Sequence, residues 1–218
     1  MSNFKDDLSA EKELGEYLDK YLYDVSPDFT DVKRIKETQM DYQYSGIDVE
    51  ASYDDEEMLI DEKGYLSSPK IMNTFALEIS YLNPRNERVE GWLFDPRKKT
   101  THYLFCWNKR DKDIDHKEVK EKDFHYVIAM LVARDDLINY LNTKYGINQE
   151  TSQEKVNEIL SSNKTGPIDK IGDNTTSKYF YSNYLAEKPI NIVLNKKELQ
   201  KIAIFHKLVK RSELKDAW

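Results

Sequence analysis

Two neighbouring segments of the sequence, residues 47–53 and 58–65, have the pattern of a β-hairpin. In the first segment apolar and polar residues alternate, and one face consists of Ile47, Val49, Ala51 and Tyr53. Four acidic residues at positions 54–57 form a short polar connection, and Met58 begins the second strand. Alternation with a period of two is typical of a strand that has one buried face. The hairpin constrains the fold most, because it fixes which side chains of the two strands share a face.

The rest of the chain predicts further strands and several helices. Residues 8–25 have apolar residues spaced by three and four, which predicts an amphipathic helix with Ser9 as its N-cap. Further strands are expected over residues 36–44, 74–82, 89–94, 102–107 and 190–194, and residues 126–133 form an apolar run. Further helices are expected over residues 134–145, 149–162 and 196–209. This mixture, with its strands clustered early, predicts an α/β (α+β) fold.

Domain organisation follows from a polar segment, residues 163–177, which has the composition of a loop or linker. We expect a core over residues 1–162 and a C-terminal α/β appendage over residues 163–218, or both parts within one single domain. The chain is long enough for either arrangement.

Charge is distributed unevenly along the chain. The 40 acidic and 33 basic residues give a net charge of −7. Residues 1–62 carry 19 acids against 6 Lys and Arg, whereas residues 188–218 carry 8 Lys and Arg against 3 acids. An acidic end binds cations or is simply solvated, and a basic end meets phosphates or only adds solubility.

Other features exclude several classes of protein. The single cysteine, Cys106, rules out an internal disulfide framework, and we expect it in the core. No apolar run approaches the roughly 20 residues that span a bilayer, and the N-terminus lacks the apolar stretch of a secretion signal. We therefore expect a cytoplasmic protein with no membrane partner.

Three residues of the hairpin, Asp48, Asp61 and Lys63, form a candidate catalytic site. Asp61 and Lys63 share a face of the second strand, and Asp48 lies on the paired strand, while Glu62 points away. Two hard carboxylates suit Mg²⁺, and a nearby ammonium group assists phosphodiester hydrolysis. The pattern Asp/Glu-x-Lys occurs five times in this charged chain, so an alternative is that Asp48 and Lys63 form an ordinary cross-strand ion pair.

Asp48, twelve intervening residues and then Asp61-Glu62-Lys63 resemble the motif of the PD-(D/E)XK nuclease superfamily. Residues 10–14, Ala-Glu-Lys-Glu-Leu, are similar to the first helix of Holliday junction resolvase-type members, which carries an active-site glutamate. The resemblance implies Glu11, Asp48 and Asp61 as metal ligands and Lys63 as the catalytic lysine. From its spacing to Leu14 and Leu18, we also expect Glu11 on the inward face of its helix.

The same resemblance implies a restriction-endonuclease-like fold, with a central mixed sheet flanked by helices. It covers about residues 8–82. In the superfamily a helix usually follows the strand that carries the lysine, whereas residues 74–82 predict another strand here. Glu78 in this strand is an additional possible ligand or, as the alternative, a salt-bridged glutamate.

The implied function is Mg²⁺- or Mn²⁺-dependent hydrolysis of DNA by a bacterial or phage nuclease, working as a homodimer. Arg97, Lys98 and Lys99, in a basic turn, and the basic tail are the expected phosphate contacts. One alternative is a non-catalytic nuclease-fold protein that binds protein or nucleic acid, because the acidic first 62 residues repel DNA without metal. Another is that the basic C-terminal segment forms a partner-binding helix.

Overall fold

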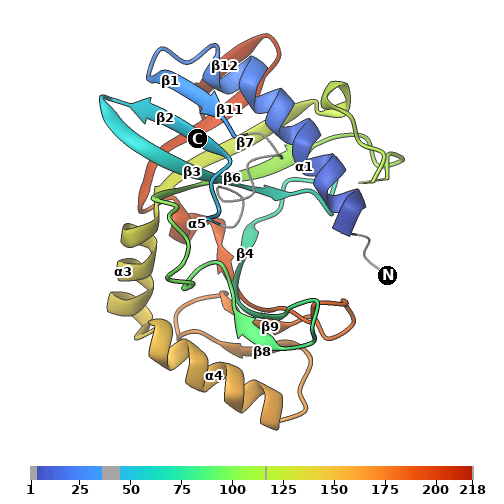
Figure 1. The fold of residues 1–218 in the computed structure, drawn as a ribbon, viewed down its shortest axis with the longest axis vertical. Helices are drawn as coiled ribbons and strands as arrows, with labels where there is room; N and C mark the ends of the chain where they lie inside the picture. Colours follow the sequence, from blue (N-terminus) through green and yellow to red (C-terminus); the bar gives the residue numbers. More distant parts are fainter. Residues whose placement is uncertain (1–3, 36–44, 116, 218) are drawn as a thin grey trace. The chain divides into compact units, whose positions relative to one another are not determined.

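The computed structural model describes residues 4–35, 45–115 and 117–217 of the chain (Figure 1). The strand expected over residues 36–44 lies outside the described residues. The protein is an α+β protein whose chain forms two compact units. The first, called here the seven-stranded unit, comprises residues 3–72, 99–133 and 203–218. The second, the five-stranded unit, contains residues 73–98 and 134–202.

The seven-stranded unit is built on a mixed sheet with the strand order β1-β2-β3-β6-β7-β11-β12. In chain order its elements are α1 (Phe4–Leu18), the π-helical turn η1 (Asp19–Tyr23), β1 (Phe29–Arg34), β2 (Val49–Tyr53), β3 (Glu56–Tyr65), β6 (His102–Lys109), the 3-10 turn η2 (Glu121–Asp123), β7 (Tyr126–Ala133), β11 (Ala203–Lys210) and β12 (Glu213–Asp216). β3 and β6 pair in parallel, and the other neighbouring strands of this order pair antiparallel. The predicted hairpin is confirmed as β2 and β3.

α1 packs across one face of this sheet (Figure 1). Its buried residues Ala10, Leu14, Tyr17 and Leu18 contact a core of buried apolar side chains from the strands. Gly64 of β3 lies directly beneath the helix, because a Cβ atom added there would come within 2.7 Å of Leu14 Cδ2. Helix and sheet therefore approach closely at the strand that carries the candidate site.

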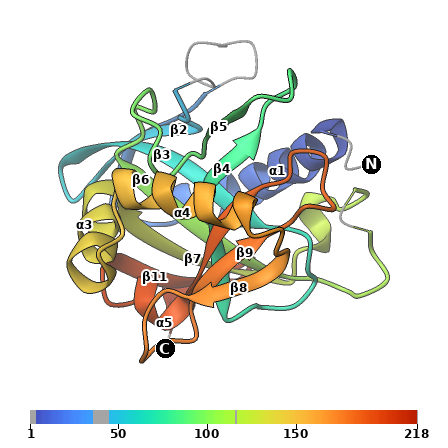
Figure 2. The ribbon, with the colours of Figure 1, turned by 90° about the horizontal axis from the view of Figure 1, so that it is seen from below.

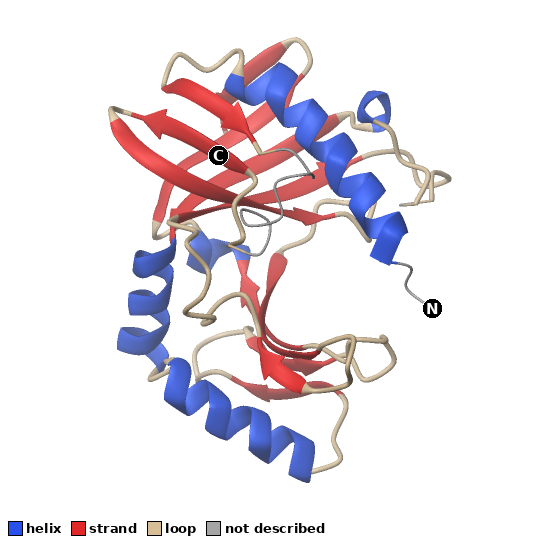
Figure 3. Ribbon diagram, in the orientation of Figure 1, coloured by secondary structure: helices blue, strands red, loops and turns tan. Residues whose placement is uncertain are grey.

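The five-stranded unit has an antiparallel sheet with the order β5-β4-β10-β9-β8 (Figure 2). Its elements are β4 (Thr74–Leu82), β5 (Arg88–Glu90), α3 (Arg134–Tyr145), α4 (Gln149–Ser161), β8 (Gly166–Lys170), β9 (Lys178–Tyr181), β10 (Ile190–Asn195) and the single turn α5 (Lys196–Leu199). α4 contacts β4. Figure 3 shows that α3 and α4 are the main helices of this unit, which otherwise consists of strands, loops and the short turn α5.

The connection between the parallel strands β3 and β6, residues 66–101, contains the strands β4 and β5 and no helix. Parallel neighbours need a long crossover, which is usually an α-helix. Here the crossover supplies two strands to the second sheet instead. The strand expected over residues 74–82 is therefore confirmed, together with the departure from the superfamily pattern.

Four sequence-based expectations about local structure are wrong. The strand expected over residues 89–94 ends at Glu90, and residues 92–94 form a turn. Ser9 is not an N-cap, because α1 already begins at Phe4. The helix expected over residues 196–209 ends after one turn, and residues 203–210 form β11, which pairs with β7. Residues 166–170, expected in a loop, form β8. Apolar residues such as Phe205 and Leu208 fit a helix by spacing, but the backbone pairing with β7 decides their conformation.

The compact units also follow a different division from the expected core of 1–162 and appendage of 163–218. The chain passes between the units several times, and its last two strands complete the sheet that contains β3. A linker composition therefore does not mark a domain boundary here. No helix in the described part of the chain is long and apolar enough to cross a membrane.

Substitution of Gly64 by alanine tests the close approach of α1 to β3. The new methyl group would displace Leu14 and Leu66, and we expect Gly64→Ala to lower the free energy of unfolding by about 1–3 kcal/mol. The cost should shrink in a Leu14→Ala background, which removes the nearest atom. Chemical denaturation of the four proteins of this cycle measures both effects, and equal costs in the two backgrounds would contradict the packing.

Candidate active site

Asp48 lies immediately before β2, whose first residue, Val49, pairs with Ile60 of β3. The charges of Asp61 and Lys63 both act on the Asp48 carboxyl group, so the three groups lie close together. The Asp48 N–H donates to Ile60 O at 2.8 Å, and the Glu62 N–H donates to Asp48 Oδ2 at 2.7 Å. The Asp48 carboxylate thus accepts a backbone hydrogen bond at the point where the ladder ends, which fixes its position beside Asp61.

Lys63 lies on the same face and contacts Asp61. Its Nζ atom is 2.7 Å from Asp61 Oδ1. Asp61 is only 4% exposed, and the side chain of Lys63 is 24% exposed, so the pair is accessible mainly from the side of the ammonium group. The structure therefore brings together the three hairpin residues that the sequence singles out.

The three side chains comprise two acidic groups and only one basic group. Burial and the neighbouring carboxylates of Asp61 and Glu62 raise the pKa of Asp48 to about 8. Burial alone would lower the pKa of Lys63, but Asp61 and Asp48 outweigh it and raise that pKa above its ordinary value. Two carboxyl groups therefore share one ammonium group, and an additional cation would relieve the repulsion between them.

Glu11 is not on the inward face of α1 as expected. It is exposed, whereas Ala10, Leu14 and Tyr17 are buried. The buried stripe of the helix is centred on these three residues, so Glu11 lies at its margin. Its negative charge still contributes to the raised pKa of Lys63, which places it within electrostatic range of the site.

The opposite face of β3 carries a second polar cluster, which confirms that Glu62 points away from Asp61. Arg34 at the end of β1 donates from NH1 and NH2 to the Glu62 carboxylate at 2.8 and 3.0 Å. It also binds Asp19 through Nε and NH2, both at 2.7 Å. The Tyr23 hydroxyl donates to Glu62 as well, at 2.9 Å. This cluster ties η1 and β1 to the back of the site.

Sequence reasoning did not identify Arg34. Its partners lie 15 and 28 residues away in the sequence, and β1 itself is not predicted by the alternation of residues. A partner at such separations cannot be read from spacing on one helix or strand.

The donor set at the site consists of two carboxylates. Within the described residues, no group of three or more His, Cys, Asp or Glu side chains is arranged to hold a metal ion. Asp48 and Asp61 alone suit Mg²⁺, which commonly binds one or two protein carboxylates and keeps several waters. Glu78 lies on β4 in the five-stranded unit.

The basic turn does not form one cluster within a single unit. Arg97 and Lys98 belong to the five-stranded unit and Lys99 to the seven-stranded unit. Arg97 binds the carboxylate of Asp95 through Nε and NH2 at 2.8 and 2.9 Å. The Lys99 N–H donates to Ser45 O at 2.9 Å, so Lys99 contacts the loop that leads into Asp48.

The core position expected for Cys106 is confirmed. Cys106 is buried, and burial raises the pKa of its thiol well above the ordinary value. Tyr103, Phe105 and Trp107 are fully buried, whereas Trp92 is partly exposed.

Comparisons with known protein families, curated proteins and solved structures find no match for this chain.

Substitution of Asp48 by asparagine tests the repulsion within the site. The pKa of Asp48 is higher in the folded protein than in the unfolded chain, so its ionisation costs stability as the pH rises from about 4 to 8. We expect Asp48→Asn to raise the free energy of unfolding by about 1–2 kcal/mol at pH 8 and to change it little at pH 4. Thermal unfolding in EDTA measures this, with Glu50→Gln on the same strand as control. A gain that does not depend on pH would contradict the repulsion.

Substitution of Arg34 tests the cluster behind β3. Arg34→Ala leaves the Glu62 carboxylate, whose side chain is 7% exposed, without its main partner, and we expect a loss of about 3 kcal/mol in unfolding free energy. The neighbouring Lys33 binds Glu50 at the surface, so Lys33→Ala should cost less than about 1 kcal/mol. The double variant Arg34→Met/Glu62→Leu should recover much of the loss in urea unfolding. Equal effects of the two single variants would show that Arg34 has no special role.

Proposed function

We propose that this protein is a metal-dependent nuclease of the PD-(D/E)XK type that hydrolyses phosphodiester bonds of DNA. The observation that supports the proposal is the close approach of three groups at the β2–β3 hairpin: Lys63 binds Asp61, and both act electrostatically on Asp48. An ordinary cross-strand ion pair between Asp48 and Lys63 does not account for this placement, because Lys63 binds Asp61 and Asp48 has a strongly raised pKa.

Each residue has a role in this proposal. Asp48 and Asp61 would hold Mg²⁺ or Mn²⁺, which would supply positive charge at the phosphate and lower the pKa of a bound water. The Glu62 N–H keeps Asp48 in place, and Lys63 places its ammonium group beside Asp61, where it can donate to the attacking water or to a phosphate oxygen. Glu11, which the resemblance implies as a further acid, is exposed and lies within electrostatic range of Lys63, so the proposed metal ligands are Asp48 and Asp61.

The fold supports the proposal in its general plan. A helix precedes an antiparallel hairpin, and a further strand pairs in parallel with β3 inside a mixed sheet. We include a restriction-endonuclease-like fold in the proposal, with β4 and β5 in place of the helix that usually follows the lysine strand. The proposal also includes a cytoplasmic setting in bacteria or phage-infected cells, and a homodimer for cleavage of both strands.

A second candidate is a nuclease-fold protein that binds protein or nucleic acid without catalysis. Two observations favour it: no third acid among the described residues completes a metal-binding group, and the seven-stranded unit has 27 acids against 19 Lys and Arg. Such a surface repels DNA when no cation is bound.

Metal binding and DNA nicking separate the two candidates. For a nuclease, calorimetry with Mn²⁺ should show binding to the wild type that Asp61→Ala loses, and Lys63→Met should nick supercoiled plasmid at least about 100-fold more slowly. The pair Glu213 and Lys215 has the same Asp/Glu-x-Lys spacing on β12, so Glu213→Ala and Lys215→Ala are matched controls that should leave both properties unchanged. Identical titrations of wild type and Asp61→Ala, with no nicking by either, would refute the nuclease.

A further inference from the structure

The basic C-terminal region divides into two parts with different charge environments. In the β11–β12 hairpin, cations are matched by nearby acids: Lys207 binds Asp216 at 2.9 Å, and Lys210 and Lys215 both bind Glu213. Arg211 binds Glu121 at 2.8 Å. The expected partner-binding helix is therefore not formed, and this half of the basic region is neutralised within the seven-stranded unit.

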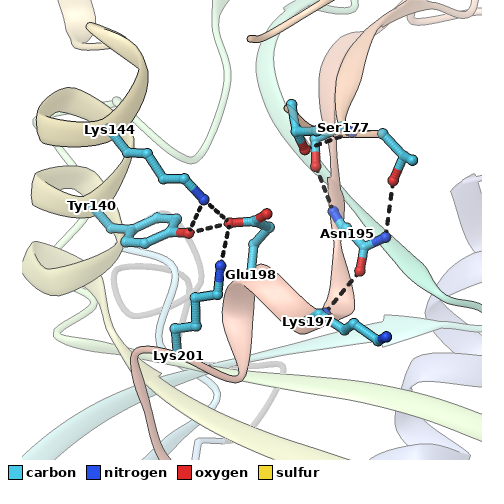
Figure 4. A network of polar contacts seen from close by, with 9 residues as sticks. Tyr140, Lys144, Ser177, Asn195, Lys197, Glu198 and Lys201 are labelled. Carbon is cyan, nitrogen blue, oxygen red and sulfur yellow. Dashed lines mark hydrogen bonds and ion pairs between the residues drawn. The ribbon is translucent and has the colours of Figure 1, made fainter. Parts of the chain in front are cut away.

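The other half lies around α5 in the five-stranded unit. There the Glu198 carboxylate accepts hydrogen bonds from Lys144, Lys201 and the Tyr140 hydroxyl, as Figure 4 shows. Lys197 points away from Glu198 in the same view. We call Lys144, Lys197 and Lys201 the α5 lysines. All three are exposed, whereas Glu198 is 8% exposed, so the outward side of this cluster is positive.

Glu198 holds part of this cluster in a fixed arrangement. The hydrogen bonds from Lys144 and Tyr140 outweigh the effect of burial and lower the pKa of Glu198 to about 2, so its carboxylate is charged at neutral pH. Lys144 also lies over the rings of Tyr140 and Tyr145, at 5.1 and 4.9 Å. Ordering of this kind reduces the conformational entropy that a lysine loses when it binds a partner.

The five-stranded unit as a whole is nearly neutral, and the seven-stranded unit is acidic. The five-stranded unit has 14 Lys and Arg against 13 acids, whereas the seven-stranded unit, which carries the proposed metal site, has an excess of 8 acids. A nuclease whose catalytic unit is this acidic needs a source of DNA affinity elsewhere.

We propose that the α5 lysines form a surface of the five-stranded unit that binds the phosphate backbone of double-stranded DNA. This inference rests on the proposed function for its choice of DNA. Lysine ammonium groups bind phosphates as point charges and lack the planar fork with which arginine reads guanine. The surface therefore contributes affinity without sequence preference.

The test measures binding of the full-length protein to a 30-base-pair fluorescent duplex in EDTA, where no cleavage occurs, over a series of salt concentrations. Each phosphate contact contributes about 0.9 to the slope of log K against log salt, so Lys197→Ala/Lys201→Ala should reduce the slope by about 2. The matched control, Lys207→Ala/Lys210→Ala, removes the same charge from paired lysines of the hairpin and should leave the slope nearly unchanged. Circular dichroism melting shows whether both variants are folded.

The inference is overturned if the α5 variant keeps the wild-type slope, or if the hairpin control loses as much. It is also overturned if the α5 substitutions weaken binding to anionic phospholipid vesicles or polyglutamate as much as binding to DNA. The outcome of this binding test is separate from the outcome of the nicking test, because Asp61→Ala should retain the wild-type slope. Loss of nicking with an intact slope would affect only the proposed function.

Discussion

The hydrogen bond from the Glu62 N–H to the Asp48 carboxylate is the contact on which the candidate site depends. It occurs where β2 separates from β3, and it holds the half-buried Asp48 within electrostatic range of the buried Asp61. A single ammonium group, that of Lys63, serves both carboxylates. Without a further cation, the arrangement is costly, as the raised pKa of Asp48 shows. The proposed metal ion would relieve this cost.

Because side chains alternate along β3, the candidate site residues and the supporting residues lie on opposite faces of the strand. Asp61 and Lys63 lie on one face, and Glu62 lies on the other, where Arg34 connects it to Asp19. Gly64 allows α1 to approach this same back face. The strand is therefore fixed from behind by an ionic cluster and a helix, which restricts local rearrangement of the charged groups on its other face.

The sequence predicts well those features that depend on residues close together in the chain. Strict alternation identified β2 and β3, and period-two geometry correctly separated Asp61 and Lys63 from Glu62. What it missed depends on contacts distant in sequence: Arg34 finds its partners across the sheet, and residues 203–210 become a strand because β7 is available to pair with them. The expectation for Glu11 was wrong for a third reason. Its spacing to Leu14 and Leu18 does not by itself define the edge of the buried face of α1.

The central claim is that Asp48 and Asp61 share a divalent cation. Anomalous diffraction from crystals grown or soaked with Mn²⁺ tests it most directly, because the signal locates the ion independently of activity. The account predicts a peak within about 2.0–2.4 Å of one carboxylate oxygen from each residue, a distance typical of oxygen ligands of hard divalent cations. Strong peaks at other acidic residues and none between these two carboxylates, at a saturating concentration of Mn²⁺, would contradict it.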